Sequence, residues 1–152
     1  MGGLNTTPNK LRGAAAVEVA LMLPWIVLMF AGVMDFGFFA YAFISVENAA
    51  REAALYTSSD PLLANNASAA CPYALGETSY LPGVTSSCSG STAGNMSLSA
   101  SLGGAQACPP PSGTASCDSV VTVTYTTQQL FPLPFMAGQL TINRTAQMRI
   151  DQ

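Results

Sequence analysis

The sequence predicts an α+β fold, in which a long N-terminal helix, transmembrane in its first part, carries a small disulfide-stapled antiparallel β domain on its outer half. Three observations predict this fold. An apolar run of membrane length starts near the N-terminus, all four cysteines follow that run, and the end of the chain alternates between apolar and polar residues. We divide the chain into a basic leader (residues 1–13), a transmembrane helix (14–34), an extramembrane continuation of the helix (35–59), a Ser/Gly/Cys-rich loop region (60–118) and a pair of antiparallel strands (119–152).

The leader is polar and contains helix breakers, which predicts disorder, and its two charged side chains, Lys10 and Arg12, are both basic. The run that follows is long enough to cross a membrane, since about 20 apolar residues span a bilayer as a helix. In a secretory signal the small residues of the cleavage site follow the apolar run. Here the small residue Gly13 precedes it, so that cleavage between Gly13 and Ala14 leaves the helix on the mature protein.

The charges that flank the apolar run predict its orientation in the membrane. The basic leader lies before the run, and the acidic residues Asp35 and Glu47 follow it. By the positive-inside rule the N-terminus is cytoplasmic and the rest of the chain lies outside. Glu47 and Arg51 have the spacing of a helical ion pair, so we expect the helix to continue beyond the membrane. A helix over residues 14–57 is about 66 Å long at 1.5 Å per residue, so half of it needs another partner.

The four cysteines, which are Cys71, Cys88, Cys108 and Cys117, predict a disulfide framework in an oxidising compartment. Four cysteines allow three pairings. We favour Cys71 with Cys88 and Cys108 with Cys117, because each pair closes a short loop rich in glycine and serine. Their spacing contains no C-x-x-C pair, which disfavours a zinc site.

The last segment predicts two paired strands. Val121, Val123 and Tyr125 alternate with threonines, which is typical of a half-buried strand, and residues 140–150 alternate in the same way. We expect these strands to pair antiparallel and to place their apolar face on the outer half of the helix. The preceding loop region shows no such periodicity, apart from a short strand at residues 98–102.

Composition excludes several classes of function. Charged residues make up 9% of the chain, whereas soluble domains have about 25%. The net charge of −3 and the lack of a basic run beyond the leader argue against nucleic acid as a partner. The chain has no histidine, the commonest general base and metal ligand, and no nucleophile or phosphate-loop motif. We therefore expect no enzyme activity, no cofactor and no metal.

Glu18 is the most informative single residue, because an acid at the centre of a membrane segment costs about 2.5–3.5 kcal/mol. One interpretation is a residue without a role, which reaches the interface from the edge of the segment. The other is a register-setting contact, in which Glu18 pairs with the new amino group of Ala14 on a neighbouring subunit. Asp35 has the same two interpretations, an interface residue or a helix-to-helix contact.

A basic leader, then Gly13, Ala14 and Glu18, then an apolar helix resemble the class III signal of type IV pilins and pseudopilins. The stretch Arg-Gly-Ala-Ala-Ala-Val-Glu-Val-Ala-Leu-Met-Leu-Pro at residues 12–24 resembles the opening of TadE-like proteins of the tight-adherence (Tad/Flp) pilus system. Residues 35–37 and 48–54 extend the same resemblance. Val19 departs from it, since the family usually has an aromatic residue there.

The resemblance implies a minor pilin or pseudopilin that takes part in pilus assembly, initiation or tip structure after cleavage by a prepilin peptidase. The implied partners are other pilin subunits, the peptidase, the inner-membrane pilus assembly platform and the lipid bilayer. The implied location is the bacterial inner membrane, with a single pass and a periplasmic C-terminal domain, or the extracellular pilus. The alternative is a signal-anchored periplasmic or cell-surface adhesion module that is not incorporated into a pilus.

Overall fold

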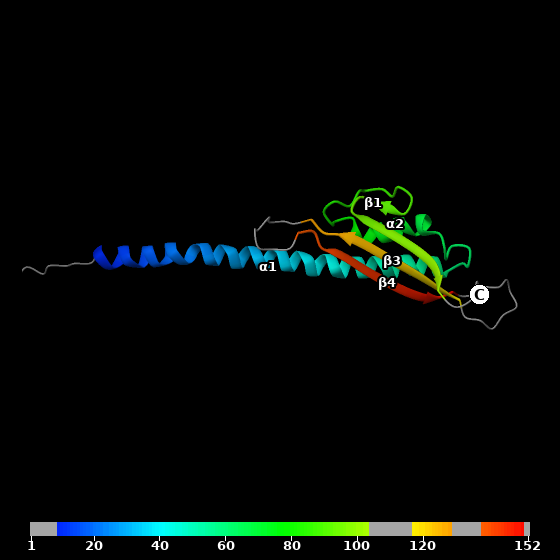
Figure 1. The fold of residues 1–152 in the computed structure, drawn as a ribbon, viewed down its shortest axis with the longest axis horizontal. Coiled ribbons are helices and arrows are strands. Elements are labelled where there is room, and N and C mark those ends of the chain that lie inside the picture. The colour runs from blue at the N-terminus through cyan, green and yellow to red at the C-terminus, as the bar shows by residue number, and fades with distance from the viewer. Residues whose placement is uncertain (1–8, 104–116, 129–137, 151–152) are drawn as a thin grey trace, which may run out of the picture. The chain divides into compact units, whose positions relative to one another are not determined.

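The computed structural model describes residues 9–103, 117–128 and 138–150, and their side chains from residue 13 onwards (Figure 1). The chain forms two compact units, Met1–Gly37 and Phe38–Gln152. The described elements, in chain order, are α1 (Asn9–Ser58), α2 (Ala67–Thr78), β1 (Thr92–Ala93), β2 (Met96–Gly103), β3 (Asp118–Thr126) and β4 (Thr141–Arg149). The predicted α+β class is confirmed.

Helix α1 runs without interruption through Pro24 and ends at Ser58, close to the predicted end. It starts earlier than expected, because the last residues of the leader are helical and not disordered. Leu11 and Arg12 are good helix formers. Adding residues to an existing helix is far easier than starting one, so the apolar helix extends backwards through them.

The sheet is antiparallel, with the strand order β1-β2-β3-β4 (Figure 1). The strand pair predicted at the end of the chain is β3 with β4, in a register that places Val121 opposite Ala146 and Tyr125 opposite Ile142. The alternation is confirmed, because Val121, Val123 and Tyr125 are buried while their threonine neighbours are not. The short strand expected at residues 98–102 lies within the longer strand β2.

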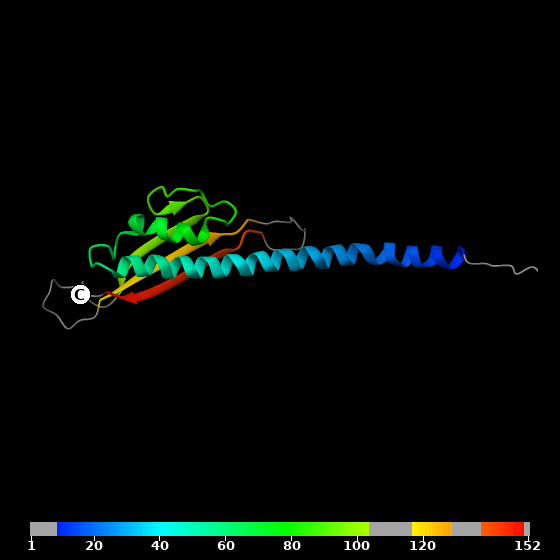
Figure 2. The same ribbon diagram turned by 180° about the vertical axis from the view of Figure 1, so that it is seen from behind.

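Helix α2 was not predicted, since residues 60–118 were expected to be mostly loops. Its N-terminus is capped by the Asn66 side chain, whose Oδ1 accepts a hydrogen bond from the amide of Ala69 at 3.0 Å. Pro72 lies inside it, a residue that disfavours helices in isolation. Seen from behind, α2 lies beside the last part of α1 on one face of the sheet (Figure 2), and the rings of Tyr56 and Tyr73 stack at 4.2 Å between them.

The disulfide prediction is confirmed for its first pair, Cys71 with Cys88, which ties α2 to the loop before β1. Cys117 is also disulfide-bonded. Its predicted partner, Cys108, lies outside the described residues.

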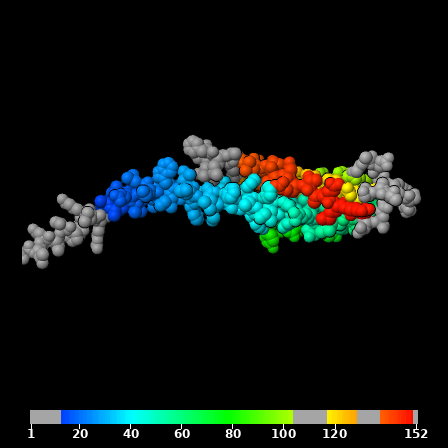
Figure 3. Space-filling view, turned by 90° about the horizontal axis from the view of Figure 1, so that it is seen from below, coloured from blue at the N-terminus to red at the C-terminus, as the bar shows by residue number. Residues whose placement is uncertain are grey.

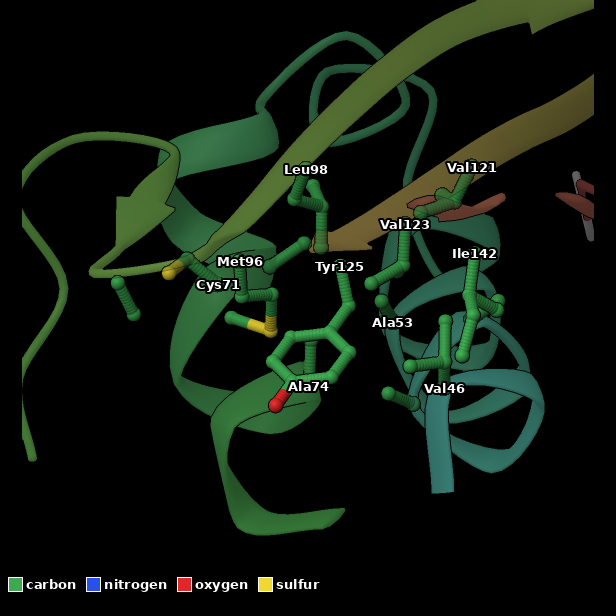
Figure 4. Close-up of a cluster of buried hydrophobic side chains, with 14 of the residues drawn as sticks. Val46, Ala53, Cys71, Ala74, Met96, Leu98, Val121, Val123, Tyr125 and Ile142 are labelled. Atoms are coloured by element: carbon green, nitrogen blue, oxygen red, sulfur yellow. The ribbon is translucent and has the colours of Figure 1, made fainter. Parts of the chain in front are cut away.

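The core of the domain forms between a face of small residues on α1 and the apolar side of the sheet. The helix contributes Ala42, Val46, Ala49, Ala50 and Ala53, all of which are fully buried or nearly so. Figure 4 shows Val46 and Ala53 close to Val123, Tyr125 and Ile142. The spacing of three and four residues places these helix positions on one stripe, and the small side chains allow the helix to lie close to the strands. This contact is the partner that the outer half of the helix was expected to need.

A buried hydroxyl contact fixes the position of α1 against the sheet, and a second hydroxyl bonds β3 to the segment between α2 and β1. The hydroxyls of Thr57 on α1 and Ser119 on β3 are 2.6 Å apart, and both residues are buried. The Tyr125 hydroxyl donates to the carbonyl of Pro82 at 2.8 Å. Burial raises the pKa of Tyr125 above its usual value, so this hydroxyl keeps its proton and its hydrogen bond at an alkaline pH at which an exposed tyrosine ionises.

We predict that Thr57→Val destabilises the domain by about 1–3 kcal/mol, because it leaves the Ser119 hydroxyl buried without its partner. Thr57→Ser, which keeps the hydroxyl, should cost less. The double variant Thr57→Val/Ser119→Ala removes both polar groups and should be more stable than Thr57→Val alone. Denaturant unfolding in detergent, followed by near-ultraviolet circular dichroism, measures all three. Equal stabilities of the Thr57→Val single variant and the double variant would contradict the role of this hydrogen bond.

Candidate membrane and assembly site

The first part of α1 presents an apolar surface on every side. Its large apolar side chains are each more than half exposed, namely Val17, Val19, Leu21, Met22, Leu23, Trp25, Ile26, Val27, Leu28, Met29, Phe30, Val33 and Met34. A helix that is apolar all round belongs inside a large protein or a membrane. Among the residues that the structure describes, α1 is the one helix long and apolar enough to cross a bilayer. Lipid or other apolar helices can therefore cover this surface.

Gly13 and Ala14, the predicted processing residues, lie in the first turns of α1. An added Cβ at Gly13 would meet nothing within 4 Å, so the backbone is accessible on that side. Glycine lowers helix stability by about 1 kcal/mol relative to alanine, which makes the helix easier to open at this position.

Glu18 and Asp35, the predicted contact residues, lie at opposite ends of the charge-free stretch of α1. Glu18 is exposed and Asp35 is half-buried. At 1.5 Å per residue their positions are about 26 Å apart along the helix axis. The hydrocarbon core of a bilayer is about 30 Å thick, so both carboxylates come near its two boundaries when the helix spans it. Within the described part of the chain neither forms an ion pair.

A second charged site lies in the domain. The predicted pair of Glu47 and Arg51 is confirmed, with a distance of 2.6 Å between Glu47 Oε1 and an Arg51 guanidinium nitrogen. Glu47 Oε2 also lies 4.0 Å from Nε of Arg144 on β4. The Arg144 guanidinium lies 3.6 Å from the centroid of the Phe43 ring, which is a cation–π contact between β4 and α1.

Arg144 did not stand out in the sequence. It occupies a position of β4 that faces the same side as Ile142 and Ala146, where the alternation predicts an apolar residue. The available signal was this break in the pattern, because an arginine on an inward position requires a carboxylate or an aromatic ring opposite. Glu47 and Phe43 on α1 supply both.

Residues 13–55 match the model of the TadE-like protein family. The match includes Gly13, Glu18, the apolar segment and Asp35, and it ends before α2 and the sheet. The comparison with curated proteins found no match, and the comparison with solved structures found none. The resemblance expected from the N-terminal residues is thereby confirmed for this part of the chain, and it supports a pilin-like protein associated with the Tad pilus.

Trp25 gives a direct test of membrane insertion, because it is the single tryptophan and it lies near the middle of the apolar segment, 72% exposed. In bilayers we predict a blue-shifted emission and quenching that is strongest with lipids brominated near the ends of their acyl chains. Fluorescence in vesicles of each brominated lipid measures this depth.

The matched control moves the tryptophan to the domain, as Trp25→Phe with Tyr80→Trp, since Tyr80 is 84% exposed. Its emission should respond to aqueous acrylamide and not to brominated lipid. A Trp25 emission that acrylamide quenches as strongly as this control would contradict insertion.

Proposed function

We propose that this protein is a minor pilin or pseudopilin-like subunit of a Tad-type pilus, cut after Gly13 by a prepilin peptidase and then assembled through α1. The observation that carries the proposal is the match of residues 13–55 to the TadE-like family, over the segment that holds the glycine, the acidic residue and the apolar helix. The role is structural and not catalytic. Its partners are other pilin subunits, the peptidase, the inner-membrane assembly platform and lipid.

The proposed topology is a single pass through the inner membrane, with the leader in the cytoplasm and the domain in the periplasm. Two features support it. Both charged side chains of the leader are basic, as the positive-inside rule requires of a cytoplasmic end. The bond between Cys71 and Cys88 suits an oxidising compartment, because disulfides are rare in the cytoplasm.

The proposed role of Glu18 follows from its spacing to the new N-terminus. Cleavage leaves a positive amino group on Ala14, four residues before Glu18. A neighbouring parallel helix that is shifted by about 6 Å along its axis brings its own Ala14 amino group level with Glu18. An unpaired charge in an apolar environment costs several kcal/mol, so this contact would select one axial register over the alternatives. Asp35 is proposed as a weaker contact of the same kind at the other end of the segment.

We predict that the mature protein begins at Ala14. Mass spectrometry of the intact protein from its native membrane measures the N-terminal residue directly. Gly13→Leu should retain the leader, because a large side chain replaces the small residue next to the cleaved bond. Gly13→Ala, which keeps a small residue, is the matched control and should be cut at least in part.

An intact leader on the native protein would instead favour the signal-anchored adhesion module. In that case the chain keeps its basic N-terminus, and Ala14 has no free amino group for Glu18.

We predict that Glu18→Ala leaves membrane insertion intact and lowers incorporation into pili at least tenfold, because the amino group of the neighbouring Ala14 loses its partner. Glu18→Asp keeps the charge on a shorter side chain and should retain part of the function. Quantifying the subunit in sheared pili and in membranes separates assembly from insertion. Normal incorporation of Glu18→Ala would refute the charge-pairing role and would leave the cleavage prediction standing.

A further inference from the structure

Strand β4 forms an edge of the sheet that is open among the residues that the structure describes. It is nine residues long and comes last in the strand order, and among the described residues β3 is the one strand paired with it. Open edges of this length are usually protected by charged side chains, by inward-pointing charges, by proline, by a bulge or by a covering segment. Strand β4 contains no proline, and its register with β3 is continuous from Thr141 to Arg149. Its charged residues are Arg144 and Arg149, and the inward-pointing Arg144 disfavours any added strand that does not supply an opposite charge.

The hydrogen bonds to β3 show which backbone groups of β4 point outward. The amide of Thr127 donates to the carbonyl of Leu140 at 2.8 Å, and the amide of Ile150 donates to the carbonyl of Cys117 at 2.8 Å. Bonding alternates along an antiparallel strand, so the even-numbered residues bond to β3. The odd-numbered residues therefore direct their amide and carbonyl groups to the open edge, and they are Thr141, Asn143, Thr145, Gln147 and Arg149.

A groove of about 390 Å³ lies beside this edge, between α1 and β4. Its lining consists of Glu47, Ala50, Arg51, Arg144, Thr145, Ala146, Gln147 and Met148. Figure 3 shows β4, in orange to red, lying along the cyan part of α1. A strand added at the open edge would continue the sheet over this groove. Every second side chain of that strand would then face the same side as Arg144 and Ala146.

The charges of the described residues that line the groove are unbalanced. Two guanidinium groups, of Arg51 and Arg144, share the one carboxylate of Glu47. Glu47 is much closer to Arg51, at 2.6 Å, than to Arg144 Nε, at 4.0 Å. Nε of Arg144 is buried and makes no hydrogen bond within the described residues. A second carboxylate in the groove would complete this set of charges.

We propose that the open edge of β4 binds an extended acidic segment of another protein by strand addition. The backbone of the segment pairs with Thr145 and Gln147, and a carboxylate on its groove-facing side pairs with Arg144 and Arg51. Backbone pairing provides affinity, as in other cases of strand addition, and the carboxylate provides selectivity. The partner is thus defined by its chemistry, an extended chain with an acidic residue flanked by small or apolar ones at alternate positions.

A second copy of this chain fits the edge less well. Two β4 strands paired antiparallel would bring two arginine-rich grooves together, with repulsion between them. They would also reverse the direction of α1 in one domain relative to the other, whereas copies inserted in one membrane must point the same way. The second reason rests on the proposed function. The open edge of β4 and the charges of the groove are observed independently of that function.

The test uses the full chain in lipid nanodiscs and two acetylated, amidated peptides, Thr-Val-Thr-Glu-Thr-Val-Thr and its matched form with Gln in place of Glu. Amide hydrogen exchange by nuclear magnetic resonance measures the site of binding. We expect slower exchange at Thr145 and Gln147 and no change at Ala146 and Met148, whose amides are already bonded. The Glu peptide should bind about tenfold more tightly than the Gln peptide, because a charge-assisted bond is roughly twice as strong as a neutral one.

Two variants of one residue provide the matched control. Thr145→Pro removes the outward amide and leaves the bonds to β3, since edge strands accept proline where the amide faces solvent. Thr145→Val keeps the amide, and both variants lose the hydroxyl contact with Thr122, which is 2.8 Å long. Binding should disappear in Thr145→Pro and persist in Thr145→Val, while exchange at the amides of β3 confirms that both are folded.

Arg144→Gln should make the two peptides bind equally. Equal binding of both peptides to the unmodified protein, or no slowing at Thr145 and Gln147 at millimolar peptide, would overturn the proposal. Neither outcome tests the cleavage after Gly13. This proposal can therefore be wrong while the proposed function is right, and the reverse also holds.

Discussion

The apolar character of α1 is the constraint on which the other features depend. A helix of this composition cannot stay exposed to water along its length, because burying apolar surface provides the main favourable free energy of folding. Within the domain the sheet and α2 cover the small-residue face of α1, from Ala42 to Thr57. Before residue 38 the described chain supplies no such cover, and almost every large apolar side chain is exposed. Lipid or other apolar segments can cover that surface.

The elements that the sequence predicted are those whose own pattern determines them. The membrane-length apolar run and the spacing of Glu47 and Arg51 define α1, alternation defines β3 and β4, and a short loop between cysteines favours the bond of Cys71 with Cys88. Helix α2 has no such pattern. Its N-terminus has a local cap, Asn66, but the disulfide at Cys71 and the packing on β2 are contacts with residues distant in sequence. The local sequence favours a helix only weakly here, and Pro72 disfavours one, so the sequence alone does not predict α2.

Among the charged residues, too, only contacts between residues close in sequence could be predicted. Glu47 and Arg51 are four residues apart on one helix, so their pairing follows from helix geometry alone. Arg144 lies nearly a hundred residues away, and its contact with the same carboxylate depends on how β4 crosses the helix. For Glu18 the spacing to Ala14 is visible in the sequence, but the partner that we propose for it belongs to another chain. No pattern within one subunit can identify that partner.

The two charged regions lie in different units, but each contains a polar or charged group that lacks a hydrogen bond or an ion pair within the described chain. In the domain, Arg144 keeps a buried nitrogen without a hydrogen bond, and in the apolar segment Glu18 and Asp35 have no ion pair within the described chain. An unsatisfied polar group that is removed from water costs about 1–3 kcal/mol, and a charge costs more. In water an isolated monomer avoids most of this cost through hydration of its exposed groups. In the assembly that we propose, membrane insertion and packing would remove that hydration. The free energy of assembly would then depend on whether a neighbour supplies the opposite charge. Charges that are tolerable in the monomer can in this way reject wrong registers and wrong partners in the assembly.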